Sequence, residues 1–177
     1  GNNSDAVEAI NSSSEHLLHI VDEVLDYSRI SSGSFVLTSE NFRLMEVVRE
    51  VESALRIQAE KKGLTLLLDV EEAKDCHVSG DAFRLRQVLY NLLGNGIKFT
   101  SKGYVKLALK TKQETSKVQC NFEISDTGIG IRREELSRIF NQFEQANVLV
   151  TRNYGGTGLG LTIAKSLVEA QGGTLDV

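Results

Sequence analysis

The sequence of 177 residues contains no proline and no tryptophan, and its only cysteines are Cys76 and Cys120. Two cysteines cannot build a disulfide scaffold in a chain of this length, so we expect two buried thiols in a reducing compartment. The lack of proline suits long helices and strands, because proline interrupts both.

The sequence also lacks a signal peptide and a long hydrophobic run. Its longest apolar run, which includes one threonine, covers residues 64–68 and has the length of a strand. A membrane-spanning helix needs about 20 apolar residues. We therefore expect a cytoplasmic piece without membrane contact, with any anchor of the full-length protein lying outside these residues.

An excess of basic charge is missing too. The chain has 20 Lys and Arg against 24 Asp and Glu, a net charge of −4, and the two signs are interspersed. Without a basic stripe, nucleic acid is not an expected partner. Apolar residues make up 41%, enough for a packed core, and the length fits one compact domain plus an attached element.

The first element is expected to be a helix over residues 5–30, where apolar residues recur at three-, four- and seven-residue steps. Residues 31–33 end it, with Gly33 as its C-terminal cap. The apolar stripe is wide and must be covered. Packing onto the chain's own domain and a helical bundle with a partner chain are both open on this evidence.

Beyond residue 33 the expected elements mix strands and helices. Strands are expected at 35–38, 64–70, 104–112, 118–125 and, unfinished, 175–177; helices at 42–61 (capped by Asn41), 82–99 (started by 79–81), 133–143 and 158–170; and a polar loop at 147–157. Because strands and helices do not alternate strictly, we predict an α+β two-layer fold and not a doubly wound parallel sheet.

Three patches carry the chemistry, and the first lies in the helix at 82–99. Asn91, Asn95 and Lys98 follow one another at i, i+4 and i+7, so they share one helix face. Amide oxygens can ligate Mg²⁺, and an ammonium group can contact phosphate. A solvated polar face is the alternative that spacing alone leaves open.

The second patch follows the strand at 118–125. Asp126 stands at the strand end, and Gly128 and Gly130 allow a sharp turn and a close approach of backbone to ligand. A carboxylate at this place can accept a hydrogen bond from an exocyclic amine. A plain β-turn would give the same pattern.

The third patch, at residues 155–161, is rich in glycine and opens a helix. Backbone N–H groups at a helix N-terminus favour a bound anion. The patch is no P-loop, since Gly-Lys-Ser/Thr is absent, and no dinucleotide fingerprint, since a loop precedes it. A flexible hinge remains the alternative.

Taken together and in this order, the patches resemble the catalytic domain of sensor histidine kinases. That family belongs to the Bergerat-fold ATPases, with type II topoisomerases and Hsp90 chaperones. The resemblance covers about residues 35–177: an asparagine box at 91–100, a first glycine box at 126–131, a phenylalanine box at 140–146 and a second glycine box at 151–161. It implies a mixed sheet covered by helices on one face. Gly96 departs from the family, where alanine is usual, and this could loosen the helix by about 0.5–1 kcal/mol.

The resemblance also implies the ligands, ATP and Mg²⁺, and the role of each site residue. Asp126 would bind the adenine amine, Phe99 and Ile131 would line the adenine pocket, and residues 144–157 would form a lid. Catalytic roles fall to Asn91, Lys98 and Arg152; nucleotide contacts to Asn95, Lys98, Phe99, Asp126, Gly128, Gly130, Ile131, Gly156, Thr157, Gly158, Leu159 and Gly160; and metal ligation to Asn95 and Asn91.

The N-terminal residues resemble the second helix of the family's dimerisation hairpin, in residues 14–18 and 26–33. We therefore divide the chain into a partial hairpin, 1–33, and an ATP-binding catalytic domain, 34–177. The resemblance implies transfer of the ATP γ-phosphoryl group to a hairpin histidine and relay to a response regulator, in a homodimer joined through this helix. The family's first hairpin helix, which carries the acceptor, is absent, and neither His16 nor His19 has its sequence context. We expect ATP binding without self-phosphorylation. A Bergerat-fold serine kinase or ATPase, and a nucleotide-binding pseudokinase module, are the alternatives.

Overall fold

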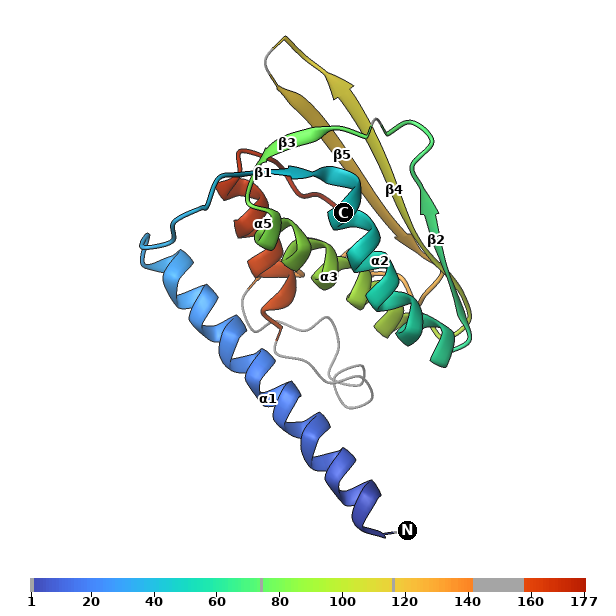
Figure 1. The fold of residues 1–177 in the computed structure, drawn as a ribbon. Helices are drawn as coiled ribbons and strands as arrows, with labels where there is room; N and C mark the ends of the chain where they lie inside the picture. The colour runs from blue at the N-terminus through green and yellow to red at the C-terminus, as the bar shows by residue number, and fades with distance from the viewer. Residues whose placement is uncertain (1, 74, 116, 142–157) are drawn as a thin grey trace.

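The computed structural model describes residues 2–73, 75–115, 117–141 and 158–177 (Figure 1). Its elements in chain order are α1 (Asn2–Ser31), β1 (Glu40–Arg43), α2 (Leu44–Lys61), β2 (Leu64–Asp69), β3 (His77–Gly80), α3 (Ala82–Phe99), β4 (Gly103–Gln113), β5 (Val118–Asp126) and α5 (Gly160–Ala170). Helices and strands are mixed as the sequence predicts, and the α+β class is confirmed. In the described part of the chain, no helix is both long enough and apolar enough to cross a bilayer.

The main sheet has the strand order β2-β4-β5, in which β2 runs parallel to β4 and β4 runs antiparallel to β5. A smaller sheet pairs β1 with β3 in antiparallel fashion. In the β4–β5 register, Val105 lies opposite Asp126 and Gln113 lies opposite Val118. The end of β5, where the second patch begins, is therefore aligned with the start of β4.

Two helices, α2 and α3, cover one face of the main sheet (Figure 1). Alternate residues of β4 point into this layer, with Val105, Leu107 and Leu109 buried. They pack with apolar side chains of both helices. Full burial of one large apolar side chain contributes roughly 1.5–3 kcal/mol to the stability of the fold. The buried helix residues of this core are Leu44, Met45, Val47, Val48, Val51, Leu55, Ala59, Ala82, Leu89, Leu93 and Ile97.

A second apolar cluster joins α5 to α3 and receives the end of α1. Its buried members are Val88 of α3 and Leu159, Ile163, Ala164 and Leu167 around α5. Tyr27, Ile30 and Phe35 pack against it from α1 and the segment that follows. The attached helix thus packs against the domain through its C-terminal part, and its other end projects away in Figure 1.

Farther from that anchor, the described apolar residues of α1 are exposed. Leu17, Leu18, Val21, Val24 and Leu25 are between 45% and 64% exposed. Among the described residues, the chain's own domain therefore leaves these five side chains largely exposed.

Several element boundaries agree with the sequence predictions and have the expected local causes. The α3 helix begins after Asp81, whose Oδ1 accepts a hydrogen bond from the backbone N–H of Arg84 at 3.0 Å. Gly33, after α1, has φ = 68°, a conformation that favours glycine.

Other expectations were wrong. The strand expected at 35–38 is absent, and the chain instead forms β1, which pairs with the unpredicted strand β3. Asn41 lies in β1 and does not cap α2, whose N-cap residue Arg43 makes no side-chain capping bond. The backbone N–H of Leu44 instead donates to the carbonyl of Cys76 at 3.1 Å, so a tertiary contact marks this boundary.

The C-terminal expectations also need correction. Residues 133–140 form hydrogen-bonded turns, such as Arg138 N–H to Glu135 O at 2.9 Å, and not the helix expected over 133–143. Residues 175–177 form no strand. The expected loop at 147–157 lies outside the described residues.

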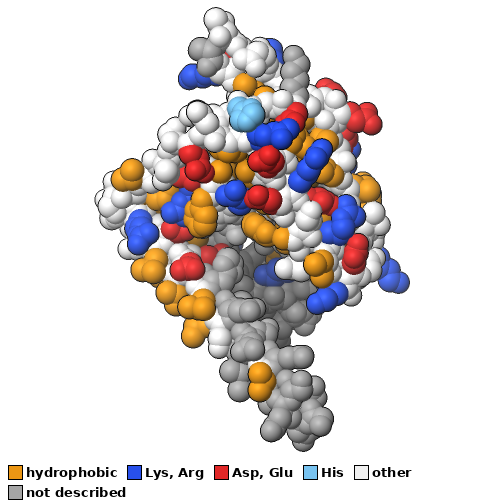
Figure 2. Space-filling model, in the orientation of Figure 1, with side chains coloured by type: hydrophobic (Ala, Val, Ile, Leu, Met, Phe, Trp, Pro, Cys, Tyr) orange, Lys and Arg blue, Asp and Glu red, His pale blue; other side chains and the backbone are white. Residues whose placement is uncertain are grey.

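The face of the molecule in Figure 2 carries interspersed acidic and basic side chains, with no stripe of one sign among those it describes. Exposed pairs include Arg43 with Asp75 and Arg86 with Glu50.

Candidate functional site

The α3 helix has an apolar face and a more polar face, and the first patch lies on the more polar one. Its apolar face buries Leu89 and Leu93 in the core. Asn91, Asn95 and Lys98 lie on another face and are half-buried. These side chains are therefore partly covered by neighbouring elements, which a freely solvated polar face would not be.

The C-terminal end of α3 meets the second patch at the end of β5. One oxygen of Asp126, Oδ1, accepts hydrogen bonds from the backbone N–H of Gly128 at 2.8 Å and from Thr100 Oγ1 at 3.4 Å. The N–H of Ile129 donates to the carbonyl of Phe99 at 3.3 Å. Oδ1 thus holds the turn against the helix, and Oδ2 takes no part in these bonds.

The geometry of this turn explains why two of its residues are glycine. A Cβ atom at Gly128 would lie 2.6 Å from Phe99 O, 2.7 Å from Asp126 Oδ1 and 2.9 Å from Thr100 Oγ1. Gly130 has φ = 67°, which disfavours residues with a side chain. A plain β-turn would not require both constraints, so the turn is built to approach α3 closely.

Gly96, where the family usually has alanine, also has a packing cause. A Cβ atom there would lie 2.9 Å from Val105 Cγ1 and 3.7 Å from Asp126 Cβ. The small residue lets α3 pack closely against the start of β4, in register with Asp126.

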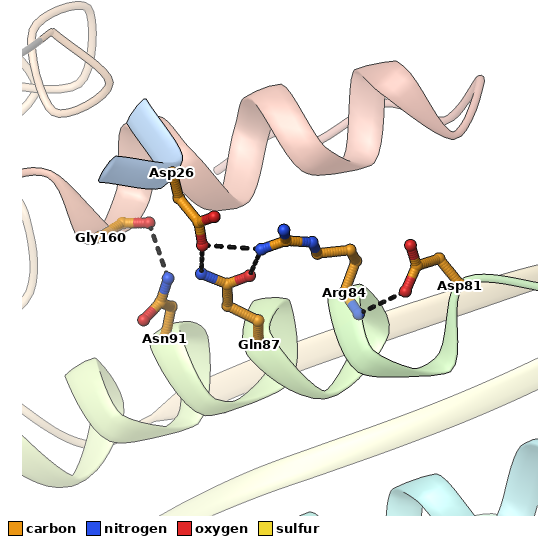
Figure 3. Close-up of polar contacts among 6 residues, drawn as sticks. All are labelled: Asp26, Asp81, Arg84, Gln87, Asn91 and Gly160. Carbon is orange, nitrogen blue, oxygen red and sulfur yellow. Dashed lines mark hydrogen bonds and ion pairs between the residues drawn. The ribbon is translucent and has the colours of Figure 1, made fainter. Parts of the chain in front are cut away.

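The third patch reaches α3 through Asn91. Its Nδ2 donates a hydrogen bond to the carbonyl of Gly160 at 3.2 Å (Figure 3), which leaves its oxygen for another partner. Gly158 has φ = 73°. The side chain of Leu159 is only 1% exposed and belongs to the core, so a ligand could meet only its backbone.

The phenylalanine box is tied to the helix that follows the third patch. Thr162 Oγ1 donates to the carbonyl of Phe140 at 2.9 Å, and Lys165 Nζ lies 4.6 Å from the centre of the Phe140 ring. The described part of this box therefore lies against α5.

The charge at this site is shared between the domain and α1. Burial lowers the pKa of Lys98, and the carboxylate of Glu23 on α1 acts in the opposite direction. Glu23 is buried, and its Oε1 would be 3.6 Å from a Cβ atom at Gly160. An anion bound between Lys98 and the start of α5 would therefore share the Lys98 ammonium group with the carboxylate of Glu23.

Sequence reasoning missed a second link between α1 and α3. Asp26 Oδ2 accepts hydrogen bonds from Arg84 Nη1 and from Gln87 Nε2, each at 2.7 Å, and Arg84 Nη1 also donates to Gln87 Oε1 at 2.7 Å (Figure 3). The side chains of Asp26 and Arg84 are each 13% exposed. The guanidinium lies 4.9 Å from the centre of the Phe35 ring. No pattern in the sequence couples Asp26 to residues 58 and 61 positions away.

The oxygen atoms of Asn91 and Asn95 suit a hard cation that also binds oxygen atoms of a ligand. Within the described residues, no group of three or more His, Cys, Asp or Glu side chains could hold a metal. Asn91 and Asn95 supply neutral oxygen atoms, and Mg²⁺ commonly combines a few protein oxygens with waters and substrate phosphates. A magnesium ion shared with a polyphosphate fits these residues.

The remaining predicted residues are placed in part. Phe99 is half-buried, and Ile131 is exposed beside the Asp126 turn. Arg152, Gly156, Thr157 and the lid expected at 144–157 lie outside the described residues.

Comparisons with known proteins show the family to which the chain belongs. Residues 80–177 match a sequence model of the family described as histidine kinase-, DNA gyrase B-, and HSP90-like ATPase. Two similar curated proteins are the autoinducer 2 sensor kinase/phosphatase LuxQ of Vibrio cholerae, 41% identical over 97% of this chain and 20% of its own length, and the signal transduction histidine-protein kinase BarA of Escherichia coli, 39% identical over 97% of this chain and 19% of its own length. The chain thus spans about a fifth of these relatives.

Solved structures show the same fold. Full-length ShkA in complex with AMPPNP superposes with a TM-score of 0.77 at 29% identity, over 97% of this chain and 35% of that one. The catalytic domain of the histidine kinase ThkA gives a TM-score of 0.58 at 28% identity, over 76% of this chain and 83% of that one. The fold is therefore the Bergerat ATP-binding fold, and the chain belongs to the histidine kinase-, DNA gyrase B-, and HSP90-like ATPases as an ATP-binding domain of the sensor histidine kinase type.

Proposed function

We propose that this chain works as the catalytic domain of a sensor histidine kinase, which transfers the γ-phosphoryl group of ATP to a histidine on its dimerisation hairpin. The phosphoryl group then passes to an aspartate of a response regulator receiver domain. The main support is that α3 contacts both the Asp126 turn and the start of α5, while the end of α1 packs against the same two helices.

In this proposal each patch meets one part of the nucleotide. Asp126 Oδ2 accepts from the adenine amine, and Phe99 and Ile131 line the adenine pocket. Lys98 and the backbone N–H groups of the second glycine box hold the phosphates. Phosphate contacts beyond Lys98 are assigned to Gly156, Thr157, Gly158, the backbone of Leu159 and Gly160, with Arg152 near the γ-phosphate.

In this reaction the protein mainly positions the reactants and neutralises charge. The acceptor imidazole attacks the γ-phosphorus, the bond to the β–γ bridging oxygen breaks, and ADP leaves. Bound Mg²⁺, held by Asn95 and Asn91, would neutralise charge on the phosphates. An asparagine at position 91 is a poor base for activating water, which favours transfer to a protein group over hydrolysis.

The domain division and the partners follow from the same proposal. Residues 1–33 are the second hairpin helix and residues 34–177 the catalytic domain. The exposed apolar stripe of α1 would be covered in a homodimer, through Leu17, Leu18, Val21, Val24 and Leu25. The sensor region and the acceptor helix belong to the rest of the protein, and the cytoplasm supplies ATP.

The proposed transfer is tested with γ-labelled ATP. The chain alone is expected to give no acid-labile, base-stable label, because neither His16 nor His19 has the context of the acceptor. Adding the first hairpin helix of the full-length protein is expected to place label on the added piece, since an acceptor must come within about 3–3.5 Å of the γ-phosphate.

Two results would contradict this account. Stoichiometric label on the chain alone, lost in His16→Ala or His19→Ala, would mean that α1 carries the acceptor. A full-length protein that binds ATP without ever acquiring label would favour a regulatory pseudokinase.

The magnesium assignment predicts a conditional effect of Asn95→Ala. Loss of a metal ligand should weaken ATP binding about tenfold in Mg²⁺ and much less in EDTA. Calorimetric titration in both buffers measures the difference. Asn121→Ala, an exposed position on β5, is the matched control and should change neither value. An equal loss for Asn95→Ala in both buffers would assign Asn95 a structural role.

A further inference from the structure

Lys62 connects the end of α2 to the end of α3. It is the C-cap residue of α2, and Gly63 with φ = 70° turns the chain into β2. Its Nζ donates hydrogen bonds to the carbonyls of Ile97 at 2.7 Å, Lys98 at 2.7 Å and Thr100 at 3.0 Å. One ammonium group thus contacts three carbonyls at the C-terminal end of α3.

These bonds stabilise the C-terminal end of α3 in two ways. The last carbonyls of a helix lack intrahelical partners, and the aligned peptide dipoles leave partial negative charge there. A lysine ammonium offers three donors and a positive charge. Lys62 therefore acts as a cationic cap supplied by a different helix.

The capped segment is the part of α3 that makes the nucleotide site. Between the three carbonyls lies the carbonyl of Phe99, which accepts from Ile129 N–H. Thr100, whose carbonyl Lys62 binds, donates through Oγ1 to Asp126. The bonds of Lys62 therefore fix the backbone that carries Lys98 and Phe99 and that joins α3 to the Asp126 turn.

We propose that Lys62 is a positioning residue for ATP binding: it holds the C-terminal end of α3 so that Lys98, Phe99 and the Asp126 turn face one ligand. The inference rests on the proposed nucleotide site and adds a residue that lies outside all four boxes. Lys62 would not touch the nucleotide.

The test compares Lys62→Met with Lys61→Met. Methionine keeps an unbranched apolar stem and removes the donors and the charge. Lys61 is the neighbouring exposed lysine at the end of α2, and the three carbonyl bonds belong to Lys62 and not to it. Calorimetry with Mg-ATP is expected to show affinity reduced about tenfold for Lys62→Met. It should be unchanged for Lys61→Met and partly restored by Lys62→Arg.

Amide hydrogen exchange without nucleotide separates positioning from general destabilisation. In Lys62→Met, exchange should quicken at Thr100 and Ile129 and stay unchanged at Leu107 in the centre of β4. Faster exchange throughout β4 together with the affinity loss would assign Lys62 a general structural role and overturn the inference.

The affinities also separate this inference from the proposed function. If the wild-type chain binds Mg-ATP and Lys62→Met binds it equally well, only the inference falls. If the wild-type chain does not bind Mg-ATP, the proposed site falls and the inference falls with it.

Discussion

Asp126→Asn is expected to weaken ATP binding by about tenfold or more while the domain stays folded. The variant keeps an oxygen that can accept from Gly128 N–H and Thr100 Oγ1, as Asp126 Oδ1 does. It replaces the second carboxylate oxygen with an NH₂ group, which meets the adenine amine donor to donor. A mispaired polar group buried by a ligand costs about 1–3 kcal/mol. Calorimetric titration with ATP and with ADP measures the loss.

The same change at Asp69 provides a matched control. Asp69 ends β2 and pairs with Lys106 at 2.6 Å on the exposed side of the sheet. Asp69→Asn should leave the affinity for ATP unchanged. Equal affinities of wild type and Asp126→Asn would remove Asp126 from the adenine site.

Gly128→Ala is expected to have a larger effect and to abolish ATP binding under the same conditions. The added Cβ would lie within 3 Å of Phe99 O, Asp126 Oδ1 and Thr100 Oγ1, so the turn must move away from α3. Overpacking of this kind costs about 1–3 kcal/mol of folding free energy. Calorimetry reports the binding, and denaturant titration reports the stability.

Gly94→Ala is the matched control, because it adds the same methyl group in the helix that borders the turn. Gly94 lies within α3, and a Cβ there meets no atom within 4 Å. Alanine should stabilise the helix by about 0.5–1 kcal/mol and leave ATP affinity intact. Wild-type affinity in Gly128→Ala would show that the turn tolerates displacement and does not position the ligand.

The sequence predicted best where the local and the tertiary signals agree. The α3 helix combines a side-chain cap at Asp81 with a long periodic pattern, and the β4–β5 hairpin alternates apolar and polar residues. The short strands β1 and β3 have four residues each and depend on pairing with each other across the chain. Residues 133–140 have a helical pattern, but so short a segment forms a helix only with tertiary support.

The same distinction applies to the site. Motifs indicated Asn91, Asn95, Lys98 and Asp126 because residue type and spacing carry that information. They could not indicate Lys62, Glu23 or the Asp26–Arg84 ion pair. Each of these meets α3 through a contact between segments far apart in the sequence. Lys62 and Lys98, for example, are 36 positions apart, and only packing of the helices brings such residues together.

In the proposed function, the end of α3, the Asp126 turn and the start of α5 form one ATP site. Backbone amide NMR of the chain, titrated with a non-hydrolysable ATP analogue and Mg²⁺, tests it directly. Signals from residues 95–100, 126–131 and 158–161 are expected to shift together along one binding curve, while those of β1 and β3 stay in place. Shifts confined to one of these segments, or gathered on other surfaces of the domain, would contradict it.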